Sequence, residues 1–178
     1  MLLFAQSIYM MLTNQRVKAG IILGQLIELE NIELLHGGDI RIKKIPIWKA
    51  KKSFFDIYCI KNIDTIEDAL NYVKINIRKI ESIITWVEES RIKIGKFLIQ
   101  IGEKDRAEDW MAQVDNYDEI TDESFIDSLD IGDICIDYEK SSSMDEFHLE
   151  ITFDPDYFNG HRSYVGVTAE RQLFEFDL

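Results

Sequence analysis

Cysteine, which cross-links small folds, and proline, which interrupts helices and strands, are both scarce in this chain. It has two cysteines, Cys59 and Cys135, and two prolines, Pro46 and Pro155, among 178 residues. Two distant thiols without a CxxC spacing favour reduced, intracellular cysteines over a disulfide framework. No Gly/Ser-rich linker divides the chain. We therefore expect a single domain over residues 1–178, which is an ordinary length for one domain.

Long apolar runs are also missing. Residues 1–12 are largely apolar but are interrupted by Gln6 and Ser7, whereas a membrane-spanning helix needs about 20 apolar residues. The segment has no basic start and no small-residue cleavage site after it, so we expect no signal peptide. We expect a cytoplasmic protein without membrane contact, whose first residues pack on the core. A true start at Met10 or Met11 is the alternative.

Motifs of nucleotide and metal sites are absent as well. The sequence contains neither GxGxxG nor GxxxxGK, and its three histidines are scattered, so we expect no nucleotide and no zinc. Asp154, Asp156 and Asn159 superficially resemble a calcium loop, but position 12 would be Val165 instead of glutamate. We expect no metal and no cofactor. Because no complete catalytic set is present, the sequence favours a protein that is not an enzyme, although catalysis stays open.

Negative charge is abundant but confined to one stretch. The chain has a net charge of −13. Residues 1–102 carry 15 basic and 11 acidic side chains, whereas residues 103–156 carry 3 basic and 19 acidic ones. Such a surface repels phosphate backbones, so we expect no nucleic-acid partner there. It would attract a basic protein and speed its association. A solvated face that only keeps the protein soluble is the other interpretation.

Hydrophobic periodicity predicts an α+β fold, an antiparallel sheet with two to three helices packed on one face. The predicted parts are a mainly β part over residues 1–62, a helical part over 64–130 and a β-meander over 131–178. Residues 40–47 and 53–60 are predicted strands. Residues 17–35 fit both a helix and a strand, and a strand is favoured because a turn signal at Gly37 and Gly38 follows.

The clearest predicted element is a helix over residues 65–89. Its apolar side chains recur at alternating spacings of four and three: Ile66, Leu70, Val73, Ile77, Ile80, Ile84 and Val87. Such a stripe is typical of a helix packed on a sheet, and a coiled-coil seam in a dimer is the alternative. Asp64 and Glu67 resemble a capping box. Two shorter helices are predicted over 92–101 and 122–129, the second with Thr121 as N-cap.

The C-terminal third is predicted to be an antiparallel meander. Strands are predicted over 131–138, where apolar and polar residues alternate from Asp133 on, and over 147–153, which alternates throughout; the final pair of strands is expected over 161–168 and 173–178. In a tight hairpin Cys135 and His148 could lie opposite or diagonal to each other on the wet face. A Cys–His pair can form a thiolate nucleophile, but the sequence offers no oxyanion element and no orienting third group, so we expect a coincidence of cross-strand pairing.

One short pattern resembles a known family. Trp110, Phe125 in a short helix, the 131–138 strand and the turn from Asp156 to His161 resemble an uncharacterised bacterial domain family with a Phe-x-Gly-His turn before the last hairpin. The resemblance covers residues 65–178 and implies a small cytoplasmic protein without a known activity. The hairpin is also loosely similar to those of bacterial immunity proteins, which are acidic and neutralise toxins. That likeness implies a protein partner.

These observations lead to two hypotheses about function. The favoured one is a non-enzymatic protein that binds a basic protein partner through residues 103–156, in the manner of an immunity protein or antitoxin. The alternative is a small-ligand-binding protein or enzyme with a site at the Phe158–His161 turn. The candidate binding residues are His161, Trp110, Asp154, Asp156, Asp118 and Glu119. We expect burial of Phe158 and a positive φ at Gly160 to shape the turn.

Overall fold

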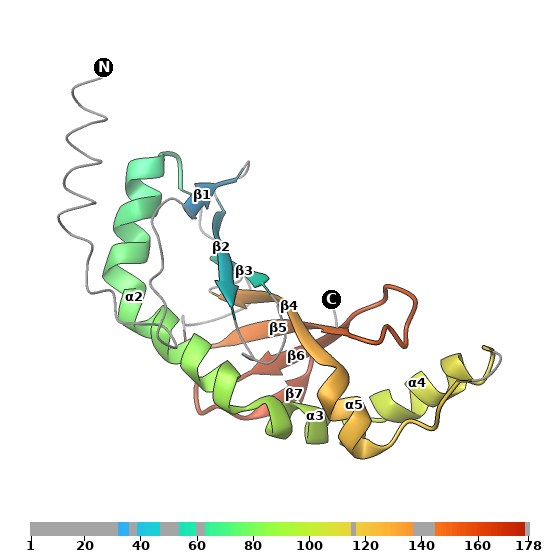
Figure 1. Ribbon diagram of the computed structural model, residues 1–178. Helices are drawn as coiled ribbons and strands as arrows, with labels where there is room; N and C mark the ends of the chain where they lie inside the picture. The colour runs from blue at the N-terminus through green and yellow to red at the C-terminus, as the bar shows by residue number, and fades with distance from the viewer. Residues whose placement is uncertain are drawn as a thin grey trace.

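The computed structural model describes residues 32–35, 39–46, 54–59, 63–114, 117–136 and 145–176. Figure 1 shows a layer of helices packed against a twisted sheet. The predictions for residues 1–12 and for residues 17–31 lie outside the described part of the chain.

Seven strands and four helices make up the described part. The strands are β1 (Ile32–Leu34), β2 (Ile40–Pro46), β3 (Phe54–Cys59), β4 (Leu129–Ile136), β5 (Phe147–Phe153), β6 (Ser163–Val167) and β7 (Leu173–Glu175). The helices are α2 (Ile66–Glu89), α3 (Arg91–Gln100), α4 (Glu103–Met111) and α5 (Asp122–Ser128). The α+β prediction is confirmed.

The strands lie side by side in the order of the sequence, in one sheet. All neighbouring pairs are antiparallel except β3 and β4, which are parallel. A parallel pair needs a long crossover connection, and all four described helices lie in this connection. The expected antiparallel meander from β4 to β7 is present, and the parallel pair joins it to the N-terminal strands.

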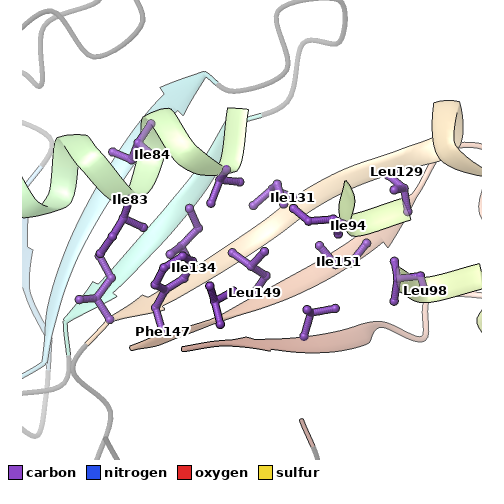
Figure 2. Close-up of a cluster of buried hydrophobic side chains, with 14 of the residues drawn as sticks. Ile83, Ile84, Ile94, Leu98, Leu129, Ile131, Ile134, Phe147, Leu149 and Ile151 are labelled. Carbon is purple, nitrogen blue, oxygen red and sulfur yellow. The ribbon is translucent and has the colours of Figure 1, made fainter. Parts of the chain in front are cut away.

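A transverse row of apolar residues crosses six strands, and its side chains on β1, β2, β4, β5 and β6 are buried in the core. The register aligns Ile32, Ile42, Ile57, Ile134, Leu149 and Val165. Figure 2 shows Ile83 and Ile84 of α2 over Ile134 and Leu149. Side chains alternate between the two faces of a strand, so a single row of this kind fixes which face the helix layer covers.

A β-bulge in β4 keeps four of its apolar residues on this inner face. The register with β5 shifts between Ile131 and Asp133, so Gly132 is the extra residue. A Cβ at Gly132 would lie 2.6 Å from a carboxylate oxygen of Glu150. One extra residue reverses the alternation of side chains. Leu129 and Ile131 before the bulge are therefore buried together with Ile134 and Ile136 after it.

Helix α2 packs on the sheet through the predicted stripe. Val73, Ile80, Ile84 and Val87 are buried, whereas Ile66 at its start is 49% exposed. The apolar side chains of the stripe are thus buried mainly by contacts within this chain.

The predicted cap of α2 is wrong by one residue. The N-cap is Thr65, whose hydroxyl accepts a hydrogen bond from the backbone N–H of Asp68 at 3.1 Å. Thr121 caps α5 as predicted, in a capping box with Ser124.

Helix α4 was not predicted. Residues 103–109 have few apolar side chains, so no periodic stripe marks the helix. Gly102, with a φ of 87°, ends α3 in the left-handed conformation and lets the chain turn into α4. The described helices are therefore four, one more than the expected two to three. Figure 1 shows α4 at the edge of the molecule, beside α5.

Replacement of Ile84 by alanine tests the core contact of α2. Ile84 is fully buried and Ile75 of the same helix is 80% exposed. We expect Ile84→Ala to lower the free energy of unfolding by about 2–4 kcal/mol because it leaves a cavity. Ile75→Ala, which makes the same change in helix propensity, should alter it by less than about 0.5 kcal/mol. Urea denaturation measures both, and equal effects would contradict the described packing.

Candidate functional site

The turn between β5 and β6 is held by the side chain of Asp156. Its carboxylate accepts hydrogen bonds from the backbone N–H of Phe158 at 3.0 Å and of Gly160 at 2.7 Å. The backbone N–H of His161 donates to the carbonyl of Phe158 at 3.1 Å. Asn159 and Gly160 have φ values of 51° and 86°, which asparagine and glycine adopt most easily. The positive φ expected at Gly160 is present.

Aromatic contacts dock this turn on α4. Phe158 is buried, and its ring centroid lies 4.8 Å from that of Phe153 and 6.1 Å from that of Trp110. The ring of His161 lies 5.1 Å from that of Trp110 in an edge contact. Trp110 remains 38% exposed, and His161 is exposed as well. The turn and the C-terminal half of α4 therefore present one joint surface with a filled base.

A buried carboxylate at the start of α4 makes the second attachment. Glu103 is 8% exposed. Its two oxygens accept hydrogen bonds from the hydroxyl of Ser163 at 2.7 Å and from Nη1 of Arg106 at 2.6 Å. The Arg106 guanidinium also lies over the Phe158 ring, 6.0 Å from its centroid. A buried charge is tolerated when it is paired and hydrogen-bonded, so these contacts fix α4 against β6 and the turn.

The structure brings together only part of the predicted site. Trp110 and His161 are in contact, and Asp156 shapes the turn beside them. The backbone N–H of Asp154 donates to the carbonyl of Ser128, and its side chain is exposed. Asp118 and Glu119 lie on the exposed segment before α5. No hydrogen bond, ion pair or ring contact among the described residues joins these two acids to the turn.

Sequence reasoning missed Glu103, Arg106 and Ser163. Glu103 follows Gly102, and a glycine followed by an acidic residue is a signal for one helix ending and another beginning. The partner Ser163 lies 60 positions further on. No local pattern relates two residues that far apart, so their contact depends on the tertiary fold.

Exposed carboxylates gather on the part of the structure formed by residues 103–114 and 117–128, which we call the acidic tip. It contains nine acidic and two basic residues. Both basic residues have partners within the tip. Lys104 pairs with Glu108 at 3.1 Å and with Asp122 at 3.2 Å, which ties α4 to α5, and Arg106 pairs with Glu103.

Five exposed acids of the tip form no ion pair with any cation of the described residues. They are Asp105, Asp109, Asp118, Glu119 and Glu123. Figure 1 shows the segment 117–121 running back beside α4 towards α5. The acidic tip therefore carries negative charge that the described part of the chain does not neutralise.

Cys135 and His148 are direct cross-strand partners, as the hairpin predicted. Burial, together with the smaller effect of the charges of Asp133, Asp39 and Glu150, raises the pKa of Cys135 to about 12. Burial lowers the pKa of His148 to about 4. A nucleophilic pair needs the opposite shifts, a thiolate beside an imidazolium. The geometry of a dyad is present, but both groups are held neutral.

The outer face of the sheet around His148 is covered by the C-terminal strand. The Phe176 ring stacks on His148 at 4.5 Å between centroids. Phe174 lies across Gly166, where a Cβ would come within 2.1 Å of the ring. Nowhere among the described residues does a group of three His, Cys, Asp or Glu side chains gather that could hold a metal ion. None of the described helices is long and apolar enough to cross a membrane.

Fold and site together define an α+β protein with an aromatic turn docked on an acidic helix. The model of a family described as an uncharacterized protein conserved in bacteria, DUF2262, matches residues 45–178. This span is more than half of the chain, so the protein belongs to this bacterial family. The resemblance read from Trp110 and the Phe158–His161 turn is confirmed, and the match begins at residue 45 instead of 65. No curated protein and no solved structure matches the chain.

The turn depends on the two hydrogen bonds that the Asp156 carboxylate accepts from backbone N–H groups. We expect Asp156→Ala to lower the free energy of unfolding by about 1 kcal/mol, since two backbone N–H groups lose their acceptor. Asp156→Asn keeps an acceptor oxygen and should lose less. Asp109→Ala is the control, because it removes the same charge from an exposed position without an ion pair. Thermal denaturation compares the three variants, and equal stability of all three would contradict the role of Asp156.

His148 makes stability depend on pH. Burial lowers its pKa from 6.5 to about 4 in the folded state, so the unfolded chain binds the proton first as pH falls. This contribution to stability is complete above pH 6.5 and is lost progressively down to about pH 4, at most about 3 kcal/mol. Urea denaturation between about pH 7 and 5 should show a smaller loss in His148→Phe than in the original protein. The carboxylates titrate in both proteins, so parallel curves would contradict this role.

Proposed function

We propose that this protein is a non-enzymatic binding protein that docks a basic protein partner on its acidic tip. The observation that carries the proposal is the set of exposed carboxylates without an internal cation, Asp105, Asp109, Asp118, Glu119 and Glu123. Like charges held close together repel one another and cost stability. A partner with complementary charge removes this cost and is steered to the surface at the same time.

Exposed apolar side chains in the acidic tip support a protein as the partner. Trp110, Val114 and Tyr117 are 38%, 52% and 38% exposed, and they lie close together in the sequence among the acids. Tryptophan and tyrosine are enriched among the residues that dominate binding energy at protein interfaces. A polar rim around an apolar centre is the usual composition of such interfaces. A small inorganic cation would use the carboxylates but not these side chains.

The end of α4 adds to the negative potential. The last turn of α4 contains Glu108 and Asp109 and no basic residue. The C-terminus of a helix carries a partial negative charge, and acidic side chains there are unfavourable. A cation supplied by a partner would compensate both the helix end and the carboxylates. Helix α4 therefore presents an electrostatic arrangement that is better satisfied in a complex than alone.

A role as an immunity protein or antitoxin fits this surface. An acidic protein that neutralises a basic toxin needs charge complementarity for fast association and apolar anchors for slow dissociation. The acidic tip offers both. The negative charge of the acidic tip and its exposed aromatic residues support this role. The same negative charge favours a basic protein over a nucleic acid as the partner, because phosphates would be repelled.

A small-ligand site at the Phe158–His161 turn is the second candidate function. It is favoured by the contact between Trp110 and His161 at 5.1 Å, with both side chains exposed. Phe158 and Tyr157 are buried and fill the base of the turn, which leaves the exposed edge for a ligand. The affinity for an uncharged ligand would not depend on salt concentration, whereas the affinity for a basic protein would fall as the salt concentration rises.

Charge reversal on the acidic tip tests the proposed function. Asp118→Lys with Glu119→Lys should weaken the complex at least about tenfold and flatten its dependence on salt. Glu170→Lys with Glu175→Lys makes the same charge change at exposed positions of the β6–β7 hairpin and is the matched control.

The experiment first captures a protein from a lysate of the source bacterium at low salt, with a wash at about 0.5 M salt. The captured protein is identified, purified and titrated against both variants. A basic protein that is lost from the tip variant and kept by the control supports the proposal. Equal binding to both variants, or binding that salt does not weaken, contradicts it.

A further inference from the structure

We infer that Asn159 is a site of spontaneous deamidation and that the Asp156 carboxylate slows this reaction in the folded protein. The reaction is carried out by the chain and water, so it needs neither a partner nor a ligand. The inference is therefore independent of the proposed function. It concerns the turn between β5 and β6, which docks on α4.

Asn159 is the one asparagine of this chain that precedes a glycine. The other six asparagines are followed by glutamine, isoleucine or tyrosine. In deamidation the backbone nitrogen of the following residue attacks the asparagine side chain, and a side chain on that following residue hinders the attack. Gly160 has no side chain, so the sequence alone makes Asn159 the most reactive asparagine of the unfolded chain.

The reaction proceeds in two steps that consume one water molecule. The Gly160 nitrogen loses its proton to hydroxide and attacks Cγ of Asn159, which forms a C–N bond and closes a cyclic imide. The side-chain nitrogen leaves with the electron pair of its bond to Cγ, takes up a proton and departs as ammonia. Water then opens the imide at either carbonyl, which gives aspartate or the β-linked isoaspartate.

The structure leaves the reacting atoms accessible to water. Asn159 and Gly160 are both exposed. Apart from its chain neighbours, no heavy atom lies within 4 Å of the position that a Cβ of Gly160 would take. Among the described residues, no hydrogen bond restrains the side-chain amide of Asn159. Steric protection by the rest of the fold is therefore small at this turn.

Asp156 opposes the attack through the nucleophilic nitrogen. The Gly160 N–H, whose proton must be lost, donates to Oδ2 of Asp156 at 2.7 Å. The negative charge of this carboxylate disfavours the amide anion that deprotonation would create beside it. Asn159 has a φ of 51°, and bringing the nitrogen to Cγ requires a backbone rotation that breaks the hydrogen bond to Asp156. The reaction therefore needs local opening of the turn.

Deamidation would alter the surface that the turn presents. Isoaspartate adds one carbon to the main chain before Gly160, and aspartate adds a negative charge close to Asp156. Both changes weaken the hydrogen bonds that hold Phe158 in place against Trp110. The modification is thus a means by which the docking of the turn on α4 is lost without any partner.

Peptide mass spectrometry after incubation in mildly alkaline buffer measures the reaction at each asparagine. In denaturant, Asn159 should react faster than the other six. In the folded protein its rate should be at least about tenfold lower than in denaturant. Asp156→Ala should raise the rate in the folded protein about fivefold, because two backbone N–H groups lose their acceptor. Asp156→Asn, which removes the charge but keeps an acceptor oxygen, should give a smaller increase.

Ile84→Ala is the matched control, because it destabilises the whole fold from α2 without changing the turn. Since the turn opens locally, this variant should deamidate at the rate of the original protein. An increase in Ile84→Ala as large as that in Asp156→Ala means reaction through global unfolding and overturns the role of Asp156. Unchanged rates in both Asp156 variants overturn it as well. If Asn159 does not react fastest in denaturant, the site itself is wrong.

Discussion

The fold depends on the burial of one apolar face of the sheet under α2 and α3. Isoleucine, leucine and valine side chains from β1, β2, β4, β5 and β6 form this face, and Ile80, Ile83 and Ile84 of α2 close it. Burial of each such side chain contributes roughly 1.5–3 kcal/mol. The parallel pairing of β3 with β4 is possible only because the helices cross over this face between the two strands. The packing of the helices on the sheet and the parallel pairing of β3 with β4 therefore depend on each other.

The acidic tip is attached to this core by a few polar and aromatic contacts. Gly102 turns the chain away from α3, and the Glu103–Ser163 hydrogen bond brings α4 back to the sheet. Phe158 then fills the space between α4 and β5. As a result, Trp110 and the neighbouring acids stand on a fixed support while remaining in contact with water. A surface that is held in place before binding loses less conformational entropy when a partner arrives.

The few residues that resemble the bacterial family have different structural roles in this protein. Phe158, Gly160 and Asp156 build the turn, whereas Trp110 and His161 stand partly in water on top of it. The structure explains the presence of Phe158, Gly160 and Asp156, because each of them meets a backbone or packing requirement of the turn. Trp110 and His161 keep exposed surface in addition to their ring contacts, and for that reason they carry the second candidate function, a ligand site at the turn.

The α+β class, helix α2, the helix capped by Thr121 and the meander follow from the amino-acid sequence alone, because each depends on periodicity or on residues within one turn of each other. The sequence also locates the negative charge between residues 103 and 156. The parallel β3–β4 pair, the existence of α4 and the burial of Glu103 against Ser163 become visible only in the folded chain. Helix α4 has no apolar stripe of its own. Its position follows from contacts with residues about 50 to 60 positions away, and a local pattern contains no information about partners that only folding brings together.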